Sequence, residues 1–187
     1  MKKYLLAIVL FVFSFPAIAQ VTINGVTLPA SLNAEKTNLI LNGGGIRKKA
    51  FFKLYTAGLY LENKTVNAEN IINADKPMAM RLQITSSMIN SDNMSEAIQE
   101  GFGKSLKGNT KPMQSKIDAF IETFKKEAIK EGDIFDLYYV PGTGIKVYKN
   151  KKFQNTTEGL DFKKALFGIW LSANPVDEAL KTGLLGK

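Results

Sequence analysis

Residues 43–62 read GGGIRKKAFFKLYTAGLYLE, and the fold prediction starts from them. The second half of this stretch, Ala50 to Leu61, is apolar at almost every position, which is typical of a buried β-strand. We expect this strand to be covered on both faces, or covered on one face and open to a cleft on the other. The run Asn38 to Asn42 predicts a preceding strand that leads into the glycines. Lys48-Lys49 would then be the turn of a β-hairpin.

Arg47 is the most informative single residue of this stretch. The chain has 25 lysines and arginines, and only Arg47 and Arg81 are arginine. A planar guanidinium beside a tyrosine and an apolar wall suits a carboxylate or another flat oxyanion better than an ammonium group does. The adjacent glycines allow the backbone to come close to another group. The alternative is an exposed Arg47 that pairs with a surface acid.

The remaining periodicities predict a mixed arrangement of strands and helices. Strands are expected at 21–28, 78–85, 134–140, 145–149 and 152–155. Amphipathic helices are expected from Asn90 or Ser91, over 112–130, around 162–170, and after Asn174 as N-cap with Pro175 at the first helical position. The helices do not alternate regularly with the strands. This order indicates an α+β fold rather than repeated βαβ units.

The N-terminus has the pattern of a secretory signal peptide. Lys2-Lys3 precede an apolar run from Tyr4 to Phe15, and the Ala-x-Ala pattern ends at Ala19. Cleavage after Ala19 would leave residues 20–187 as a single domain, periplasmic or secreted. The apolar run is shorter than the ~20 residues of a membrane span, so an uncleaved anchor is the less favoured alternative. No later stretch is apolar enough to be a transmembrane segment.

The composition excludes several kinds of chemistry. The chain contains no histidine and no cysteine, which removes Ser-His and Cys-His nucleophilic sites, disulfides and the usual zinc sites. We expect no metal and no cofactor. The formal net charge is +8, but the lysines are dispersed and base recognition relies on arginine, so a nucleic-acid partner is not expected. Protein partners remain open. Asp133 and Asp136, which flank a predicted strand, are interpreted as structural acids.

Two blocks of the sequence resemble the chalcone isomerase family. The first is GGGIR at 43–47 followed by KLYTAGLYLE at 53–62, and the second is LDFKKALFGIWL at 160–171 followed by NPVD at 174–177. The second block looks like the bacterial exported branch of the family, and the resemblance covers nearly all of residues 20–187. It implies an open-faced β-sandwich, in which a large antiparallel sheet carries a helical layer on one side. The ligand cleft would lie between the sheet and the helices.

The resemblance also implies roles for particular residues. In plant enzymes of the family, the arginine after the glycines binds the substrate oxyanion, and Arg47 matches it. The threonine that polarises the ketone is replaced by Tyr55, while Thr56 is adjacent but points to the opposite face. The plant enzymes also use a tyrosine and an asparagine at the next helix start, where residues 86–94 contain no tyrosine. An arginine with a tyrosine is similar to the fatty-acid-binding members, which hold a carboxylate with both side chains.

These observations support three functional hypotheses. The preferred one is a non-catalytic carrier or sensor that binds a fatty acid or similar amphipathic carboxylate, with Arg47, Tyr55, Thr56 and Arg81 as candidate ligand-binding residues. Tyr55 could instead be a core tyrosine, and Arg81 part of an ion pair. The second hypothesis is an isomerase or lyase for phenolic enones, with Arg47 as oxyanion donor. The third is a structural envelope protein whose cleft is filled by side chains such as Phe51 and Trp170.

Overall fold

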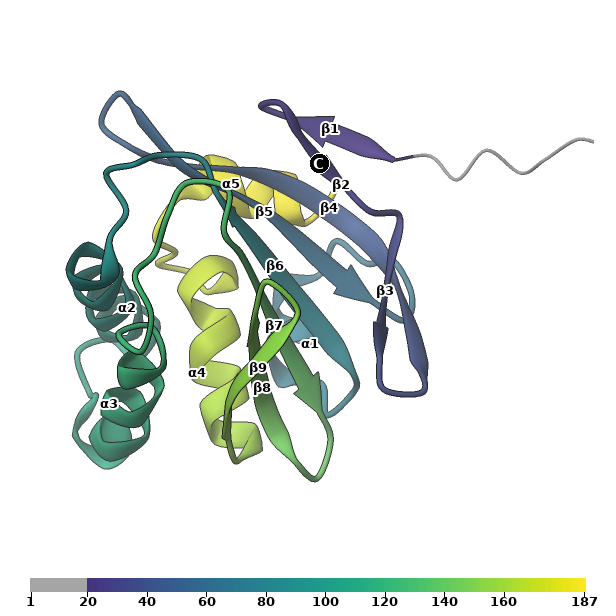
Figure 1. The fold of residues 1–187 in the computed structure, drawn as a ribbon. Helices are drawn as coiled ribbons and strands as arrows, with labels where there is room; N and C mark the ends of the chain where they lie inside the picture. The colour runs from purple at the N-terminus through teal and green to yellow at the C-terminus, as the bar shows by residue number, and fades with distance from the viewer. Residues whose placement is uncertain (1–19) are drawn as a thin grey trace, which may run out of the picture.

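The computed structural model describes residues 20–187, and the predicted signal peptide lies outside the described residues. Seven strands form one antiparallel sheet in which every strand pairs with its neighbour in the sequence, in the order β3 to β9 (Figure 1). They are β3 (Ser31–Ala34), β4 (Thr37–Lys49), β5 (Phe52–Leu61), β6 (Met78–Ile84), β7 (Ile134–Val140), β8 (Gly144–Lys149) and β9 (Lys152–Thr157). A separate hairpin consists of β1 (Val21–Ile23) and β2 (Val26–Leu28). The predicted α+β fold is confirmed.

Helices cover one face of this curled sheet, as Figure 1 shows for α2, α3 and α4. The helices are α1 (Ala68–Asn73), α2 (Ser91–Ser105), α3 (Gln114–Thr123), α4 (Leu160–Leu171) and α5 (Glu178–Leu184), and the 3₁₀ turn η1 (Lys111–Met113) precedes α3. The main core lies on the helix side and includes the clustered rings of Phe102, Phe120 and Phe162. A smaller core under β1, β2 and β3 includes Leu28 and Tyr60. The second face of the sheet is therefore partly covered.

The β4–β5 hairpin turns later than predicted. β4 continues through the glycines to Lys49, and the turn consists of Ala50 and Phe51 instead of Lys48-Lys49. Ala50 has a positive φ of 53°, in the left-handed region that favours glycine, and no glycine marks the turn in the sequence. Both faces of β5 are buried after Lys53, as expected for a strand that is covered twice.

Other boundaries also differ from the prediction. The expected strand at 21–28 is two strands, because Asn24-Gly25 forms a tight turn with positive φ at both residues. The strand β3 and the helix α1 were not predicted. The last helix begins at Glu178 with Asp177 as its N-cap, whose carboxylate accepts a hydrogen bond from the backbone N–H of Leu180, rather than after Asn174. The helix expected over 112–130 is shorter, because α3 ends at Thr123.

Lys163, on α4, is the most deeply buried cation of the fold. Its side chain is fully buried, and Nζ donates to the carbonyl oxygens of Ile71, Ile72 and Ala74 at 2.7, 2.9 and 2.8 Å. A positive charge is favourable there because the C-terminal carbonyl groups of α1 carry partial negative charge. Burial lowers the pKa of Lys163 to about 8. This contact ties α1 to the helical layer.

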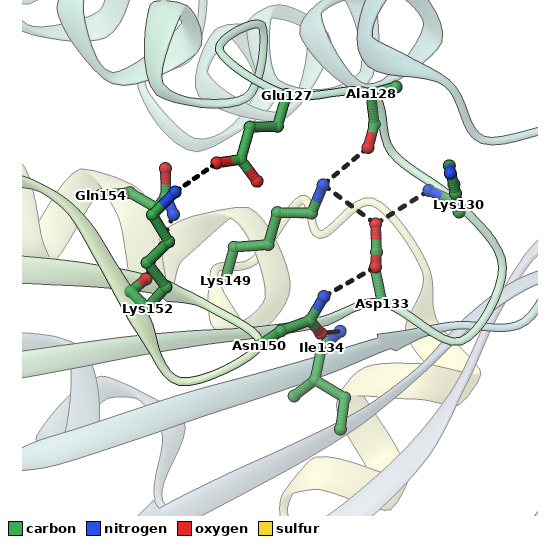
Figure 2. Close-up of polar contacts among 9 residues, drawn as sticks. All are labelled: Glu127, Ala128, Lys130, Asp133, Ile134, Lys149, Asn150, Lys152 and Gln154. Carbon is green, nitrogen blue, oxygen red and sulfur yellow. Dashed lines mark hydrogen bonds and ion pairs between the residues drawn. The ribbon is translucent and has the colours of Figure 1, made fainter.

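A second polar cluster fixes the segment between α3 and β7 to the sheet (Figure 2). The buried Lys149 forms an ion pair of 3.0 Å with Asp133 and donates to the Ala128 carbonyl at 2.6 Å. Asp133 also accepts hydrogen bonds from Asn150 and from the backbone of Lys130. Partial burial raises the pKa of Asp133, but these hydrogen bonds outweigh that effect and hold the pKa below its usual value. The interpretation of Asp133 as a structural acid agrees with these contacts.

Candidate ligand-binding site

An apolar pocket lies between the sheet and the helical layer. Its walls come from β4, β5, β6 and β7 on one side and from α2, α3 and α4 on the other. The apolar wall includes Leu54, Met94, Ile98, Phe124, Leu137 and Ile169. The cavity volume is about 60 Å³, and all the empty space between the walls, including space open to solvent, is about 700 Å³. A cavity measured as the former needs ~10–15 Å³ to hold one water. The cavity therefore has room for only a few waters, and a long acyl chain would have to displace side chains.

Arg47 and Tyr55 lie at the polar end of this pocket. They are directly paired across β4 and β5, so both side chains point to the helix side of the sheet. The next pairing joins Lys48 to Lys53, which leaves Leu54 as an extra residue in β5. Such a β-bulge redirects the side chains around it, and Leu54 and Tyr55 both line the pocket. The predicted neighbourhood of Arg47 and Tyr55 is thus present in the structure.

Asp177 is the acidic neighbour of Arg47. The distance between Arg47 Nη1 and Asp177 Oδ2 is 3.6 Å, and only 14% and 12% of the two side chains are exposed. This separation is longer than a hydrogen bond. Nη1 donates instead to the carbonyl oxygen of Lys48. Because a guanidinium carries five N–H donors, Arg47 retains donors for a ligand oxygen.

Asp177 is itself held by backbone groups. Its carboxylate accepts from the N–H groups of Lys48 and Leu180, each at 3.0 Å. Burial opposes ionisation, but these two hydrogen bonds and the charge of Arg47 lower the pKa of Asp177 below its usual value. Asp177 therefore joins the start of α5 to the end of β4 and keeps Arg47 at the pocket.

The Tyr55 hydroxyl is arranged as a hydrogen-bond donor. Its oxygen accepts a hydrogen bond of 3.0 Å from the indole Nε1–H of Trp170 on α4. Burial raises the pKa of Tyr55 above the ordinary value of 10, although Trp170 and Arg47 act in the opposite direction. The phenol thus stays protonated at neutral pH. Its own proton remains available, since no acceptor within residues 20–187 forms a hydrogen bond with it.

The glycines do not hold space open for a ligand. A Cβ atom on Gly43 would lie 2.3 Å from the Gly183 oxygen of α5, and one on Gly45 would lie 3.0 Å from the Leu180 side chain. A Cβ on Gly44, on the other face, would lie 2.6 Å from Leu28 of β2. The sequence predicts that the glycines let the backbone come close to another group. That group is not a ligand: α5 packs against β4 at Gly43 and Gly45, and the β1–β2 hairpin packs against it at Gly44.

Comparison with known families agrees with this fold. The profile of the family described as "Chalcone isomerase-like" matches residues 20–186. The chain belongs to the chalcone isomerase-like family. No curated protein sequence matches it. Among solved structures, this family member is similar to a fatty-acid-binding protein of Arabidopsis thaliana, with 22% identity, a TM-score of 0.75, and coverage of 89% of this chain and 96% of the plant chain. At that identity the likeness shows the fold.

Two of the four predicted ligand-binding residues of this chalcone isomerase-like protein lie away from the pocket. Thr56 is completely buried on the other face of β5, and its hydroxyl has no partner within residues 20–187. Arg81 lies across the sheet in a bidentate pair with Asp136, with distances of 2.7 and 2.8 Å. It borders a separate groove together with Tyr138. Thr56 and Arg81 therefore cannot contact the same head group as Arg47 and Tyr55.

The locations of Phe51 and Trp170 test the third hypothesis, in which such side chains fill the cleft. Phe51 is 98% exposed at the end of the β4–β5 hairpin, so it does not fill the pocket. Trp170 is buried in the pocket wall, where it orients Tyr55. Sequence reasoning missed Trp170 as a partner of Tyr55, together with Asp177, Lys49 and Glu100 at the pocket. Asp177 and Trp170 had a signal, because both lie in the second block that resembles the family, whereas Lys49 and Glu100 had none.

Residues 20–187 contain neither a metal-binding cluster nor a helix that could span a membrane. Within residues 20–187, no group of three or more metal-ligating side chains is gathered. None of the helices in that part of the chain has the length and apolar character needed to cross a bilayer.

Proposed function

We propose that this chalcone isomerase-like protein is a non-catalytic carrier or sensor for a fatty acid or a similar amphipathic carboxylate. The observation that carries the proposal is the position of Arg47 opposite Tyr55 at the polar end of an apolar pocket. The guanidinium and the phenol O–H would donate to the carboxylate, and the tail would lie against Leu54, Ile98 and Ile169. The similar plant structure is a fatty-acid-binding protein, which supports the same class of ligand.

The chemistry of the pocket favours binding over turnover. A charge-assisted hydrogen bond contributes ~1.5–3 kcal/mol, and each buried methylene about 0.8 kcal/mol. A tail of about ten carbons can thus offset the cost of ordering a ligand. Tyr55 is a poor general base, because its raised pKa keeps the hydroxyl protonated. Since the cavity volume is only about 60 Å³, the flexible Met94 and its neighbours on α2 would move aside for the tail.

The proposed location is the periplasm or the exterior of a bacterial cell. The support for it is the signal-peptide pattern of residues 1–19 and the absence of cysteine from the whole sequence, both of which fit an exported protein stabilised by its core.

Substitution at Arg47 and Asp177 tests the carrier function. In a titration with a fluorescent fatty acid, Arg47→Met should weaken binding about tenfold or more, because one charge-assisted contact is lost. Asp177→Asn should tighten binding several-fold, since asparagine can keep the helix cap at the Leu180 N–H but no longer competes for the guanidinium. Its amide nitrogen cannot accept from the Lys48 N–H, so that contact is lost. Both variants must first show the circular dichroism of the wild type. Equal affinities in all three proteins would contradict the proposal, and turnover of a phenolic enone that depends on Arg47 would favour an isomerase.

A further inference from the structure

The end of the β4–β5 hairpin presents apolar and basic side chains together. We call residues 48–53, Lys-Lys-Ala-Phe-Phe-Lys, the hairpin tip. All six are exposed, with Phe51 at 98% and Phe52 at 52%. Figure 1 shows the hairpin projecting beyond the neighbouring strands at the upper left. Two exposed phenylalanines at such a projection contribute nothing to the core, so the fold alone does not explain them.

The charges of the hairpin tip are not neutralised by acids. Within residues 20–187, no carboxylate lies within ion-pair distance of the side chains of Lys48, Lys49 or Lys53. Lys53 Nζ donates to the neutral side-chain oxygen of Asn24 at 2.9 Å. Aromatic side chains flanked by unpaired lysines match the chemistry of an anionic bilayer surface, where rings enter the interface and ammonium groups contact the head groups.

The hairpin tip is also continuous with the pocket entrance. Lys49 lines the pocket together with Arg47, and Phe52 is the cross-strand partner of Lys49. The loop after β6 begins beside the tip, where the Thr85 N–H donates to the Leu54 carbonyl at 3.0 Å. Met88 of that loop is exposed, and the next residue, Ile89, lines the pocket. A bilayer held at the tip would therefore lie close to the opening.

We propose that the hairpin tip docks the protein on an anionic lipid bilayer. Phe51 and Phe52 enter the interfacial region, and Lys48, Lys49 and Lys53 contact the anionic head groups. Docking in this orientation brings the polar end of the pocket to the membrane surface, where an amphipathic carboxylate can pass between bilayer and protein. The transfer role rests on the proposed carrier function, whereas the docking itself does not.

The β8–β9 turn supplies a matched control. Phe153 is 52% exposed, the same fraction as Phe52, and follows Lys151 and Lys152. Its surroundings differ, because Lys152 is paired with Glu127 at 2.7 Å and the Phe153 ring contacts Tyr148 at a centroid distance of 5.6 Å. The Lys152–Glu127 pair is visible in Figure 2. Acid neighbours reduce the attraction of this turn to an anionic surface.

Vesicle co-sedimentation tests the docking. Wild-type protein should bind vesicles of phosphatidylglycerol and phosphatidylethanolamine and bind phosphatidylcholine vesicles far less. In the double variant Phe51→Ser/Phe52→Ser the partition coefficient onto these vesicles should fall roughly tenfold or more, and Phe153→Ser should not change it.

The contribution of charge is tested separately. In Lys48→Gln/Lys53→Gln the partition coefficient should fall more than about tenfold, since each lysine near an anionic surface contributes roughly fivefold. The equally charged control Lys107→Gln/Lys111→Gln, at exposed sites on the α2–α3 connection, should lose little.

The outcomes separate docking from ligand binding. Phe51→Ser/Phe52→Ser should still bind the fluorescent fatty acid in solution, whereas Arg47→Met should still bind vesicles. Vesicle binding that is absent in the wild type, or equally reduced by Phe153→Ser, would overturn the proposal. A wild-type dimer that becomes monomeric in the double variant, without vesicle binding, would show instead that the tip contacts a second copy of the chain.

Discussion

Gly43→Ala should destabilise the protein by about 3 kcal/mol or more. The new Cβ would lie 2.3 Å from the Gly183 oxygen, 2.7 Å from the Gly186 nitrogen and 2.8 Å from the Leu184 oxygen. All three are backbone atoms and cannot rotate away, so α5 must move off β4. This costs more than the ~1–3 kcal/mol that is typical of an overpacked core. Urea unfolding followed by circular dichroism gives the difference in the free energy of unfolding.

Gly103→Ala is the matched control for this change. Gly103 lies in α2 with no atom within 4 Å of the position of a new Cβ, and its φ is not positive. Alanine should therefore stabilise the helix by about 0.5–1 kcal/mol. Similar stabilities for Gly43→Ala and the wild type would contradict the tight contact between α5 and β4.

Arg81→Met should destabilise the protein by about 3–5 kcal/mol. Asp136 is only 4% exposed and its carboxylate is bonded by both nitrogens of the bidentate Arg81 contact. Removing the guanidinium leaves a buried charge without its partner, and this is the costly way to break a buried ion pair. The same unfolding experiment measures the loss.

The double variant Arg81→Met/Asp136→Leu distinguishes the unpaired charge from a loss of packing. It should recover most of the stability, because replacing a whole buried pair by apolar side chains is often neutral or stabilising. A loss of less than about 1 kcal/mol in Arg81→Met would show that water reaches Asp136. A double variant as unstable as the single one would show that the side-chain packing of Arg81 is what matters.

Local patterns predicted the elements whose signals are complete within a few residues. The apolar run of β5, the cap of α2 at Asn90 and the turns at 141–144 and 150–151 follow from periodicity and turn chemistry. The β4–β5 turn could not be placed in this way, because Ala50 carries the positive φ without a glycine to signal it. A turn at Lys48-Lys49 would have paired Arg47 with Ala50 instead of Tyr55.

Which residues meet at the pocket depends on how strands and helices that are distant in the sequence pack together. The side of the sheet on which Arg81 lies is set by the register between β5 and β6, in which Tyr55 pairs with Ile84. This register joins two separate strands, so no pattern within one strand could predict it. Asp177 reaches Arg47 only because α5 lies against the glycines of β4. Arg47 was found from its rarity in the composition and from the adjacent glycines, and Tyr55 from the family resemblance. Trp170 could not be assigned, since its hydrogen bond to Tyr55 joins residues 115 positions apart.

Our central claim is that Arg47 recognises a carboxylate whose tail lies in the pocket, and a four-way binding comparison tests it most directly. Calorimetry would measure hexadecanoate and hexadecanol, which share one tail, against the wild type and Arg47→Met. The wild type should prefer the acid by about tenfold or more. In Arg47→Met that preference should vanish, while the affinity for the alcohol stays unchanged. An equal preference for the acid in both proteins would contradict the claim.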